Sequence, residues 1–348
     1  MDRAVRRPPH RRPQAQLPHR PHLPADRPRL GAGQALPQAR LDLVAVPAHG
    51  VHGLGGRDLL LVGVICVAWA FNFLTSAWAL QEIPPFLFTA VRLAILALLL
   101  VPFLKPPAQG QWPLLFAVAL CNGVVHFGLS FWALQLAGNL SSPAIVMQSY
   151  VPMAALLAWW WLGERFAWRT ALAIALSFAG VLVIGFDPMV LRAPASLVLM
   201  LVSAFFLATG TVLMRRLTGL DMFSQQGWTA VIGLLPLLLL SALLEPGGFA
   251  GLRNASWVAW GGAAYSAIGS SLLGHGLYYV LVQRHPVAQV TPWLLLSPVL
   301  AVVLGLLFYG DDPGPQLWIG GAMVLGGVLL IALRALAKSR PLPQARDI

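Results

Sequence analysis

The chain has 348 residues, of which 58% are hydrophobic and only 10% are charged. Soluble domains carry about 25% charged residues, so this composition excludes an ordinary soluble protein and is typical of one that crosses a membrane many times. The formal net charge of +11 would suit a nucleic-acid-binding protein, but most of the positive residues lie in an N-terminal segment and in short loops between apolar stretches. That distribution indicates membrane topology and no nucleic-acid partner.

The first 56 residues differ from the rest of the chain. They contain nine proline and nine arginine residues but no aromatic residue, serine or threonine. Such a segment cannot bury enough apolar surface to offset the entropy that it would lose on ordering. We therefore expect residues 1–56 to be a disordered basic extension, which could also arise from a misassigned start of translation. The alternative is a basic segment that touches anionic lipid.

From residue 57 the chain consists of apolar stretches of the length that crosses a bilayer, which is about 20 residues for a helix. Turn and breaker residues separate these stretches, which cover 58–80, 84–104, 113–137, 141–162, 167–186, 194–217, 222–244, 256–283, 287–308 and 314–336. The sequence therefore predicts an all-α integral membrane protein with ten transmembrane helices.

The positions of lysine and arginine predict the orientation. With the N-terminus inside, the inner segments after residue 56 hold eleven of these residues, whereas the outer loops hold only Arg192 and Arg253. Positive residues accumulate on the cytoplasmic side of membrane proteins. We therefore expect a multi-pass protein of the cell inner membrane with both termini in the cytoplasm, which requires an even number of spans.

The chain contains an internal repeat of five spans. Residues of the third to fifth spans recur in the eighth to tenth at an offset of 146–148 positions, as in the pairs Pro152 and Pro298, Gly163 and Gly310, and Gly180 and Gly327. An odd number of spans inverts the second copy relative to the membrane, as in many secondary transporters. We expect two inverted five-helix repeats, at 57–187 and 188–338, between the extension 1–56 and a cytoplasmic tail, 339–348.

With this layout, residues 57–338 resemble the EamA-type permeases of the drug/metabolite transporter superfamily. The resemblance lies in Trp69, Asn72-Phe73, Pro84-Pro85, Arg92, LGER at 162–165, VQRHPVAQVTPWLLLSPV at 282–299 and LLFYGD at 306–311. The second half is similar to O-acetylserine/cysteine exporters around Arg284 and Pro298. The resemblance implies efflux of small metabolites such as amino acids and their derivatives. The family usually has Gly-Glu in both repeats, but the second repeat here has Gly310-Asp311, which weakens the case for a gate in that copy.

Polar residues inside the spans are the candidate lining of a substrate cavity, because such residues are costly in lipid and face protein or water. On α-helical spacing, one stripe joins Asn122 to His126 and Ser130, and another joins Ser271 to His275 and Tyr279. Arg92 could hold a substrate carboxylate, bond backbone carbonyls or extend outward, and each histidine could relay protons or complete an interhelical hydrogen bond. The candidate cavity residues are Trp69, Asn72, Arg92, Asn122, His126, Ser130, Gln148, Tyr150, Ser271, His275, Tyr278, Tyr279 and Trp293.

Two further pairs are candidates for moving parts. Pro152 and Pro298 lie in the fourth and ninth spans, where proline frees a carbonyl and permits a bend, so both are candidate hinges. Glu164 and Arg165 follow the fourth span at the inner surface, where they could form a gate contact or simply anchor the topology.

No carboxylate lies in the central part of a span and no metal-ligand spacing is present, so we expect no catalytic residue, metal or cofactor, and no enzyme. We interpret the sequence as a secondary transporter that exports small polar metabolites, such as amino acids or derivatives, by alternating access. Uptake or exchange of a sugar or nucleotide derivative is the alternative, and a membrane scaffold without transport is a different class. The expected partners are the lipid bilayer, a small-molecule substrate and protons as a candidate coupling ion, while the oligomeric state is left open.

Overall fold

The computed structural model describes residues 54–285 and 287–339, and every regular element in them is helical. The first repeat contains α1 (Gly56–Ala79), α2 (Pro85–Leu100) with the 3₁₀ turn η2 (Val101–Phe103), α3 (Trp112–Ala119), the π-helix η3 (Leu120–His126), α4 (Phe127–Ala137), α5 (Ser141–Met147), α6 (Tyr150–Leu162) and α7 (Trp168–Ile184). The second contains α8 (Pro188–Leu191), α9 (Pro194–Met214), α10 (Met222–Leu244), α11 (Gly248–Leu252), α12 (Trp257–Tyr265), the π-helix η4 (Ser266–Gly274), α13 (His275–Arg284), α14 (Val287–Leu294), α15 (Leu296–Leu304), the π-helix η5 (Gly305–Tyr309) and α16 (Pro315–Ser339).

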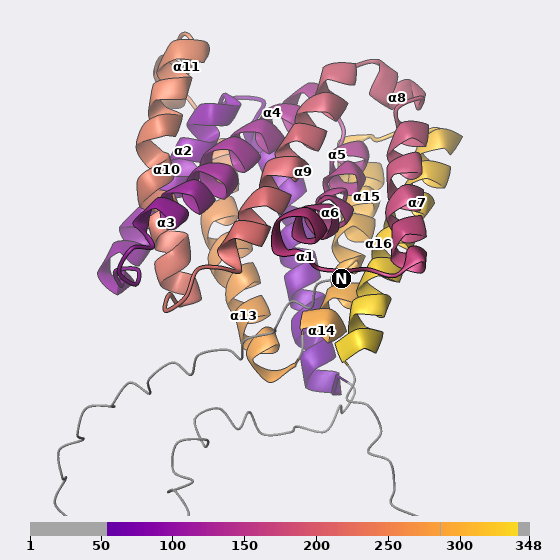
Figure 1. Cartoon of the computed structure of the whole chain (residues 1–348). Helices are drawn as coiled ribbons and strands as arrows, with labels where there is room; N and C mark the ends of the chain where they lie inside the picture. The colour runs from indigo at the N-terminus through magenta and orange to yellow at the C-terminus, as the bar shows by residue number, and fades with distance from the viewer. Residues whose placement is uncertain (1–53, 286, 340–348) are drawn as a thin grey trace, which may run out of the picture. The chain divides into compact units, whose positions relative to one another are not determined.

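The predicted spans agree closely with these helices, which form a bundle (Figure 1). Within the described residues, eight helices are long and apolar enough to cross a membrane, and Trp168–Ile184 is a shorter apolar helix. The remaining predicted span corresponds to the continuous run α12, η4 and α13, whose serine and glycine residues make it less apolar. The protein is therefore an all-helical membrane protein, and the count of ten spans stays a prediction. The short helices α8 and α11 were not predicted, and the extension 1–56 lies almost entirely outside the described residues.

Irregular helix geometry recurs at equivalent places of the two repeats. The π-helix η3 in the third span has its counterpart in η4 in the eighth. The fourth span is interrupted between α5 and α6, just before Pro152, and the ninth between α14 and α15, just before Pro298. These interruptions lie where the sequence placed the candidate hinges, and both copies show them because the proline residues recur.

The helices α7 and α16 show the relation between the repeats most directly. They pack so closely that a Cβ atom at Gly180 would lie 2.6 Å from the Gly320 carbonyl oxygen. A Cβ at Gly327 would lie 2.6 Å from the carbonyl oxygen of Ala173. Because Gly180 corresponds to Gly327 and Ala173 to Gly320 in the repeat, these two contacts are exchanged by a pseudo-two-fold axis. Small residues permit such backbone approach between membrane helices.

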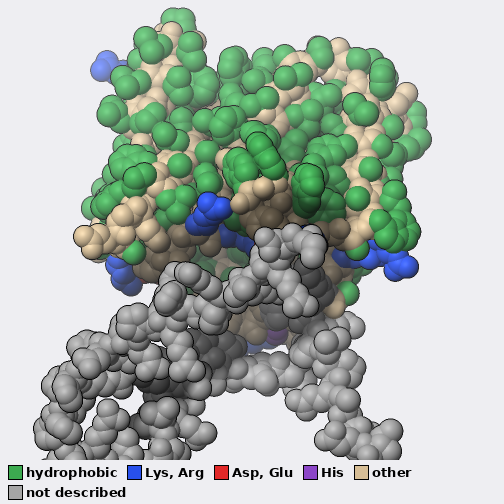
Figure 2. Space-filling view, viewed as in Figure 1, with side chains coloured by type: hydrophobic (Ala, Val, Ile, Leu, Met, Phe, Trp, Pro, Cys, Tyr) green, Lys and Arg blue, Asp and Glu red, His purple; other side chains and the backbone are tan. Residues whose placement is uncertain are grey.

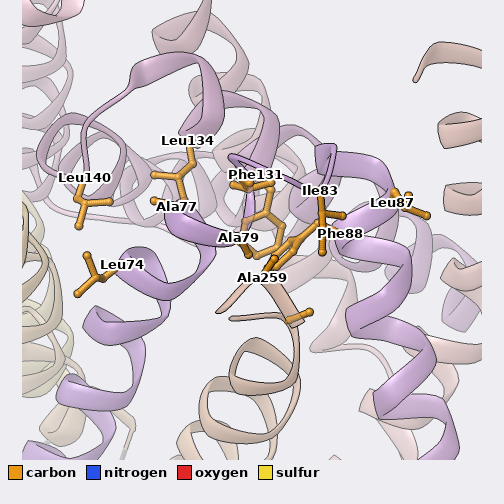
Figure 3. Packing of buried hydrophobic residues seen from close by; sticks show 12 residues of the cluster. Leu74, Ala77, Ala79, Ile83, Leu87, Phe88, Phe131, Leu134, Leu140 and Ala259 are labelled. Atoms are coloured by element: carbon orange, nitrogen blue, oxygen red, sulfur yellow. The ribbon is translucent and has the colours of Figure 1, made fainter. Parts of the chain in front are cut away.

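The apolar core is divided among several clusters between neighbouring helices. Figure 3 shows one of them, in which Phe88 of α2 and Phe131 of α4 meet edge to face with ring centroids 4.8 Å apart. Many large apolar side chains point outward instead, for example Leu98, which is 79% exposed, and Trp257, which is 85% exposed. Such outward side chains suit lipid, because a membrane helix needs no polar face toward the bilayer.

Four carboxylates join the two repeats on one face of the bundle. We call this the opposite face, because α1 begins and α16 ends on the other, which we call the N-face (Figure 1). Each carboxylate accepts hydrogen bonds from backbone N–H groups at the start of a helix in the other repeat, where such groups lack intrahelical partners. Glu82 binds Ser256 before α12, Asp187 binds Leu317 of α16, Glu245 binds Phe86 and Leu87 of α2, and Asp311 binds Leu140 and Ser141 of α5.

The N-face carries most of the positive side chains. Figure 2 shows lysine and arginine gathered mainly along the lower edge of the viewed face, below a broad apolar surface. Lys105 Nζ lies 2.7 Å from Asp221 Oδ2, and this contact raises the pKa of Lys105 and lowers that of Asp221. Because this ion pair is exposed, water screens it and it adds little to stability.

Candidate functional site

Arg92 is the centre of the polar cluster inside the bundle. Its side chain, on α2, is only 2% exposed. Nε donates to the Ser266 carbonyl at 3.3 Å and Nη2 donates to the Ser271 hydroxyl at 2.6 Å, while the guanidinium carbon lies 3.7 Å from the Phe127 ring centroid. These contacts offset part of the cost of a buried cation. The remaining nitrogen, Nη1, is buried without a hydrogen-bond partner among the described residues.

The π-helix η4 places two of these partners. Ser271 Oγ donates to the Ser266 carbonyl, five residues earlier, at 3.1 Å and accepts from Arg92. Widening of the helix turns a carbonyl and a hydroxyl toward the same guanidinium. π-helical turns are frequent at functional sites. Gln226 of α10 adds a fourth group, since its side-chain amide donates to the Ser271 carbonyl at 3.3 Å.

His275 and Trp69 lie beside this cluster. The ring centroids of the two side chains are 5.1 Å apart. Trp69 Nε1 donates to the Ser270 carbonyl at 3.3 Å, and His275 Nδ1 lies 3.1 Å from the same oxygen. Because a carbonyl only accepts, Nδ1 of His275 carries the proton in this contact. The ring of Tyr278, 6.1 Å from that of Trp69, extends the aromatic wall.

His126 faces the second repeat from η3. Its Nδ1 lies 2.9 Å from Ser203 Oγ, and that hydroxyl donates to the His126 carbonyl at 2.9 Å. Because the Ser203 hydroxyl donates its only proton to that carbonyl, Nδ1 of His126 is the donor in its contact with Ser203 Oγ. The His126 ring also contacts the Phe127 ring, with centroids that lie 4.6 Å apart, and the Arg92 guanidinium lies over that same Phe127 ring. The two histidines therefore flank one arginine.

The structure does not bring the other candidates into the same cluster. Ser130 donates to the Phe127 carbonyl of its own helix and Asn72 accepts from Ser76 one turn away. Tyr150 packs among apolar residues between α6 and α9. Asn122 lies against Gly210, and its side-chain oxygen is buried without a partner among the described residues. Gln148 lies at the break between α5 and α6. Tyr279 is partly buried, and Trp293 is 52% exposed.

The α-helical spacing assumed for the two polar stripes is wrong over part of their length. Residues 120–126 and 266–274 are π-helical, with a wider turn than the α-helix on which the stripes were drawn. Sequence reasoning also missed Ser203, Gln226, Ser266 and Ser270, each of which contacts a predicted residue. The run SAIGSSLLG at 266–274, unusually rich in small polar residues, was the signal that could have identified η4.

The candidate gate residues differ between the repeats. Glu164 Oε1 lies 2.5 Å from Arg215 Nη2, both side chains being about half exposed, and Arg165 is exposed. Asp311, the counterpart of Glu164, is instead 9% exposed and accepts from Leu140, Ser141 and the Ser141 hydroxyl. Both carboxylates contact the other repeat, but only Asp311, in the copy that the sequence made the weaker candidate, binds the start of a helix there.

The polar cluster is closed to solvent in this conformation, since Ser271 is 1% exposed and His126 is 6% exposed. Its hydrogen bonds join one repeat to the other, because Trp69, Arg92 and His126 belong to the first and their partners to the second. A polar centre between two helical repeats of this kind is typical of membrane transporters.

The chain belongs to the EamA-like transporter family, whose model matches residues 57–186 and 195–333. It is 23% identical over 282 residues to a probable amino-acid metabolite efflux pump of Escherichia coli K12, which covers 79% of this chain and 94% of that protein. It is 30% identical over 233 residues to a probable terminal-alkyne amino-acid exporter of Streptantibioticus cattleyicolor, covering 64% and 75%. A solved crystal structure shares the fold, with a TM-score of 0.55 and 19% identity over 82% of this chain and 99% of that one.

Proposed function

We propose that this protein exports small polar metabolites that carry a carboxylate, such as amino acids or their derivatives, by alternating access between its two repeats. The similar proteins described as an amino-acid metabolite efflux pump and an amino-acid exporter support export. We further propose that the protein lies in the inner membrane with both termini in the cytoplasm, as the lysine and arginine positions predict.

The observation that carries this proposal is the free Nη1 of Arg92. Two of the three guanidinium nitrogens are used by Ser266 and Ser271, which fix the plane of the group. The third is buried and unpaired among the described residues. A buried donor without an acceptor is costly, so an acceptor supplied by a substrate is favoured, and a carboxylate matches the guanidinium best. His275 and Trp69, whose side chains both contact the Ser270 carbonyl beside Ser271, are the residues that we propose to contact the rest of a small substrate.

Untargeted comparison of culture medium tests the proposal. Cells with the wild-type protein should release one or more small carboxylates that cells with Arg92→Met release at a rate lower by on the order of 30-fold. Arg253→Met, which removes an exposed arginine from the opposite face, is the matched control and should match the wild type. Arg92→Lys should restore little, because lysine cannot keep both serine contacts and offer a further donor in one plane.

The amount of protein in the membrane is measured for each variant. If Arg92→Met fails to accumulate, Ser271→Ala replaces it, since that change removes the contact to Nη2 and should lower release less severely. Wild-type medium identical to that of cells without the protein would contradict export. Depletion of a sugar or nucleotide derivative from the medium would favour uptake instead.

A further inference from the structure

The contacts that join the repeats can be compared between the two faces, because the pseudo-two-fold axis exchanges them. At the first junction, Glu82 follows α1 and accepts from the backbone N–H and hydroxyl of Ser256, both at 2.6 Å, which lowers the pKa of Glu82. The mirrored junction on the N-face is also closed. There Thr218, which follows α9, exchanges two hydrogen bonds with Gln111, which precedes α3.

The second junction is likewise closed on both faces. On the opposite face, Glu245 at the end of α10 accepts from the first turn of α2 at 2.7 and 3.0 Å. On the N-face, Lys105 beyond α2 binds the start of α10, where its N–H donates to Ser224 Oγ at 3.1 Å and its ammonium group pairs with Asp221. Hydrogen bonds therefore join the second and seventh spans at both ends, and α2 and α10 pack closely along their length.

The junction between the fourth and ninth spans breaks this symmetry. On the opposite face, Asp311 Oδ2 accepts from Leu140 N at 3.0 Å, Ser141 N at 2.8 Å and Ser141 Oγ at 2.5 Å. Gly305 makes room for it, since a Cβ there would meet the Asp311 carboxylate. The mirrored contact on the N-face would join Glu164 to the start of α14, but Glu164 pairs instead with Arg215, which follows α9.

Local geometry shows that Asp311 and Glu164 are equivalent. Gly163 and Gly310, which precede them, have φ angles of 67° and 75°, in the left-handed region that glycine adopts readily. The N–H of Glu164 donates to the Ala158 carbonyl at 3.3 Å, and the N–H of Asp311 donates to the Gly305 carbonyl at 3.1 Å. The same six-residue turn thus presents a carboxylate at each face, and only the partner differs.

Packing of the two spans shows the same asymmetry. The halves of these spans near the opposite face, α5 and α15, lie in contact. Ala144 and Ala301 are fully buried there together with Ala70 of α1. The halves near the N-face, α6 and α14, form no comparable contact among the described residues. The fourth and ninth spans are therefore joined beneath Asp311 and separate toward the N-face.

We propose that Asp311 and Glu164 are alternating helix caps that close the two ends of the transport path in turn. In the conformation described here, Asp311 caps the fourth span and closes the opposite face. In the other conformation, Asp311 releases Ser141, Glu164 leaves Arg215, and the Glu164 carboxylate accepts from the first-turn N–H groups of α14. Those groups lie at the positive end of the helix dipole, which favours a carboxylate. This inference rests on the alternating access of the proposed function.

Cysteine accessibility tests the proposal without any transport measurement, so its failure is distinct from failure of export. Cys66 and Cys121 are first replaced with alanine. Ala144→Cys then reports on the opposite face, where it is fully buried, and Thr291→Cys, its counterpart in the repeat, reports on the N-face. A membrane-impermeant maleimide is applied to each side of sealed vesicles.

Asp311→Asn should raise labelling at Ala144→Cys by on the order of tenfold and lower labelling at Thr291→Cys, because one population grows at the expense of the other. Asp312→Asn, which removes the neighbouring exposed carboxylate, is the matched control and should change neither rate. Adding Glu164→Gln to Asp311→Asn should return both rates toward the starting values.

Unchanged labelling in Asp311→Asn overturns the proposal. A rise at Ala144→Cys without a fall at Thr291→Cys also overturns it, since that result shows local fraying of α5 and no exchange of states. If Asp311→Asn does not reach the membrane, Ser141→Ala removes one of the three bonds to Asp311 and should produce the same opposed changes at smaller size. No opposed change in that variant would be equally decisive against the proposal.

Discussion

Arg92 shows how one residue gains a role through its neighbours. The sequence marked it as an arginine within an apolar span and left open whether it bound a substrate or only backbone carbonyls. In the structure, Ser266 supplies a backbone carbonyl and Ser271 a hydroxyl, while the third guanidinium nitrogen has no hydrogen-bond partner among the described residues. The serine partners could not be assigned from sequence, because their positions depend on a π-helix that no simple periodicity reveals.

The two histidines belong to the same residue-scale argument. Both lie beside the Arg92 cluster, since the His126 ring contacts Phe127, which lies against the guanidinium, and His275 contacts Ser270 next to Ser271. A bound carboxylate would offset the positive charge of Arg92 and would therefore reduce its repulsion of a protonated histidine nearby. Proton coupling through these side chains would thereby link the proton to the substrate.

We predict that His275→Gln abolishes the pH dependence of export between about pH 6 and pH 8, the range in which histidine titrates, while substrate binding stays measurable. His126→Gln should do so more weakly, because Ser203 already engages both its ring and its carbonyl. Initial export rates at several pH values measure the effect. If both single variants and the double variant keep the wild-type pH profile, the histidines are structural, and coupling must be sought elsewhere.

At the scale of elements, the spans follow from the sequence and their irregularities do not. Long apolar stretches ended by proline, glycine and charged residues predict the helix ends well, because a membrane helix must satisfy its backbone internally. The repeat also predicts that the fourth and ninth spans share a break, through Pro152 and Pro298. The helix pairing could not be predicted, because the apolar faces of membrane helices carry little pattern.

The pairing of α7 with α16 provides a test at this scale. We predict that Gly320→Ala destabilises the folded protein by roughly 1–3 kcal/mol, as overpacking does, because the new Cβ would lie 2.5 Å from the Gly180 carbonyl oxygen. Gly326→Ala in the same helix is the matched control, since a Cβ there meets nothing within 4 Å and alanine favours the helix. Thermal unfolding of the purified proteins in detergent compares them. Equal midpoints would contradict the close packing of the two helices.

For the whole molecule, charge and chemistry are divided between two faces. The four carboxylates that accept backbone N–H groups at helix starts of the other repeat lie on the opposite face, whereas the N-face carries most of the lysine and arginine (Figure 2). Anionic groups suit the helix starts that the opposite face presents, and positive residues suit the cytoplasmic side of a membrane. One arrangement of acids and bases thus serves both the packing of the repeats and their orientation.

Orientation is the last prediction. Asp312→Cys should react with an impermeant maleimide only from outside the cell, and Gln109→Cys, exposed on the N-face, only from inside, both in a background without Cys66 and Cys121. Asp312 is a better reporter than the nearby Gly314, where a side chain would meet the Asp187 carboxylate. Labelling of both sites from one side would contradict the inverted repeat. Labelling of each from the side opposite to that expected would keep the repeat and the alternating caps but reverse the membrane orientation, so that the conformation described here would be closed toward the cytoplasm.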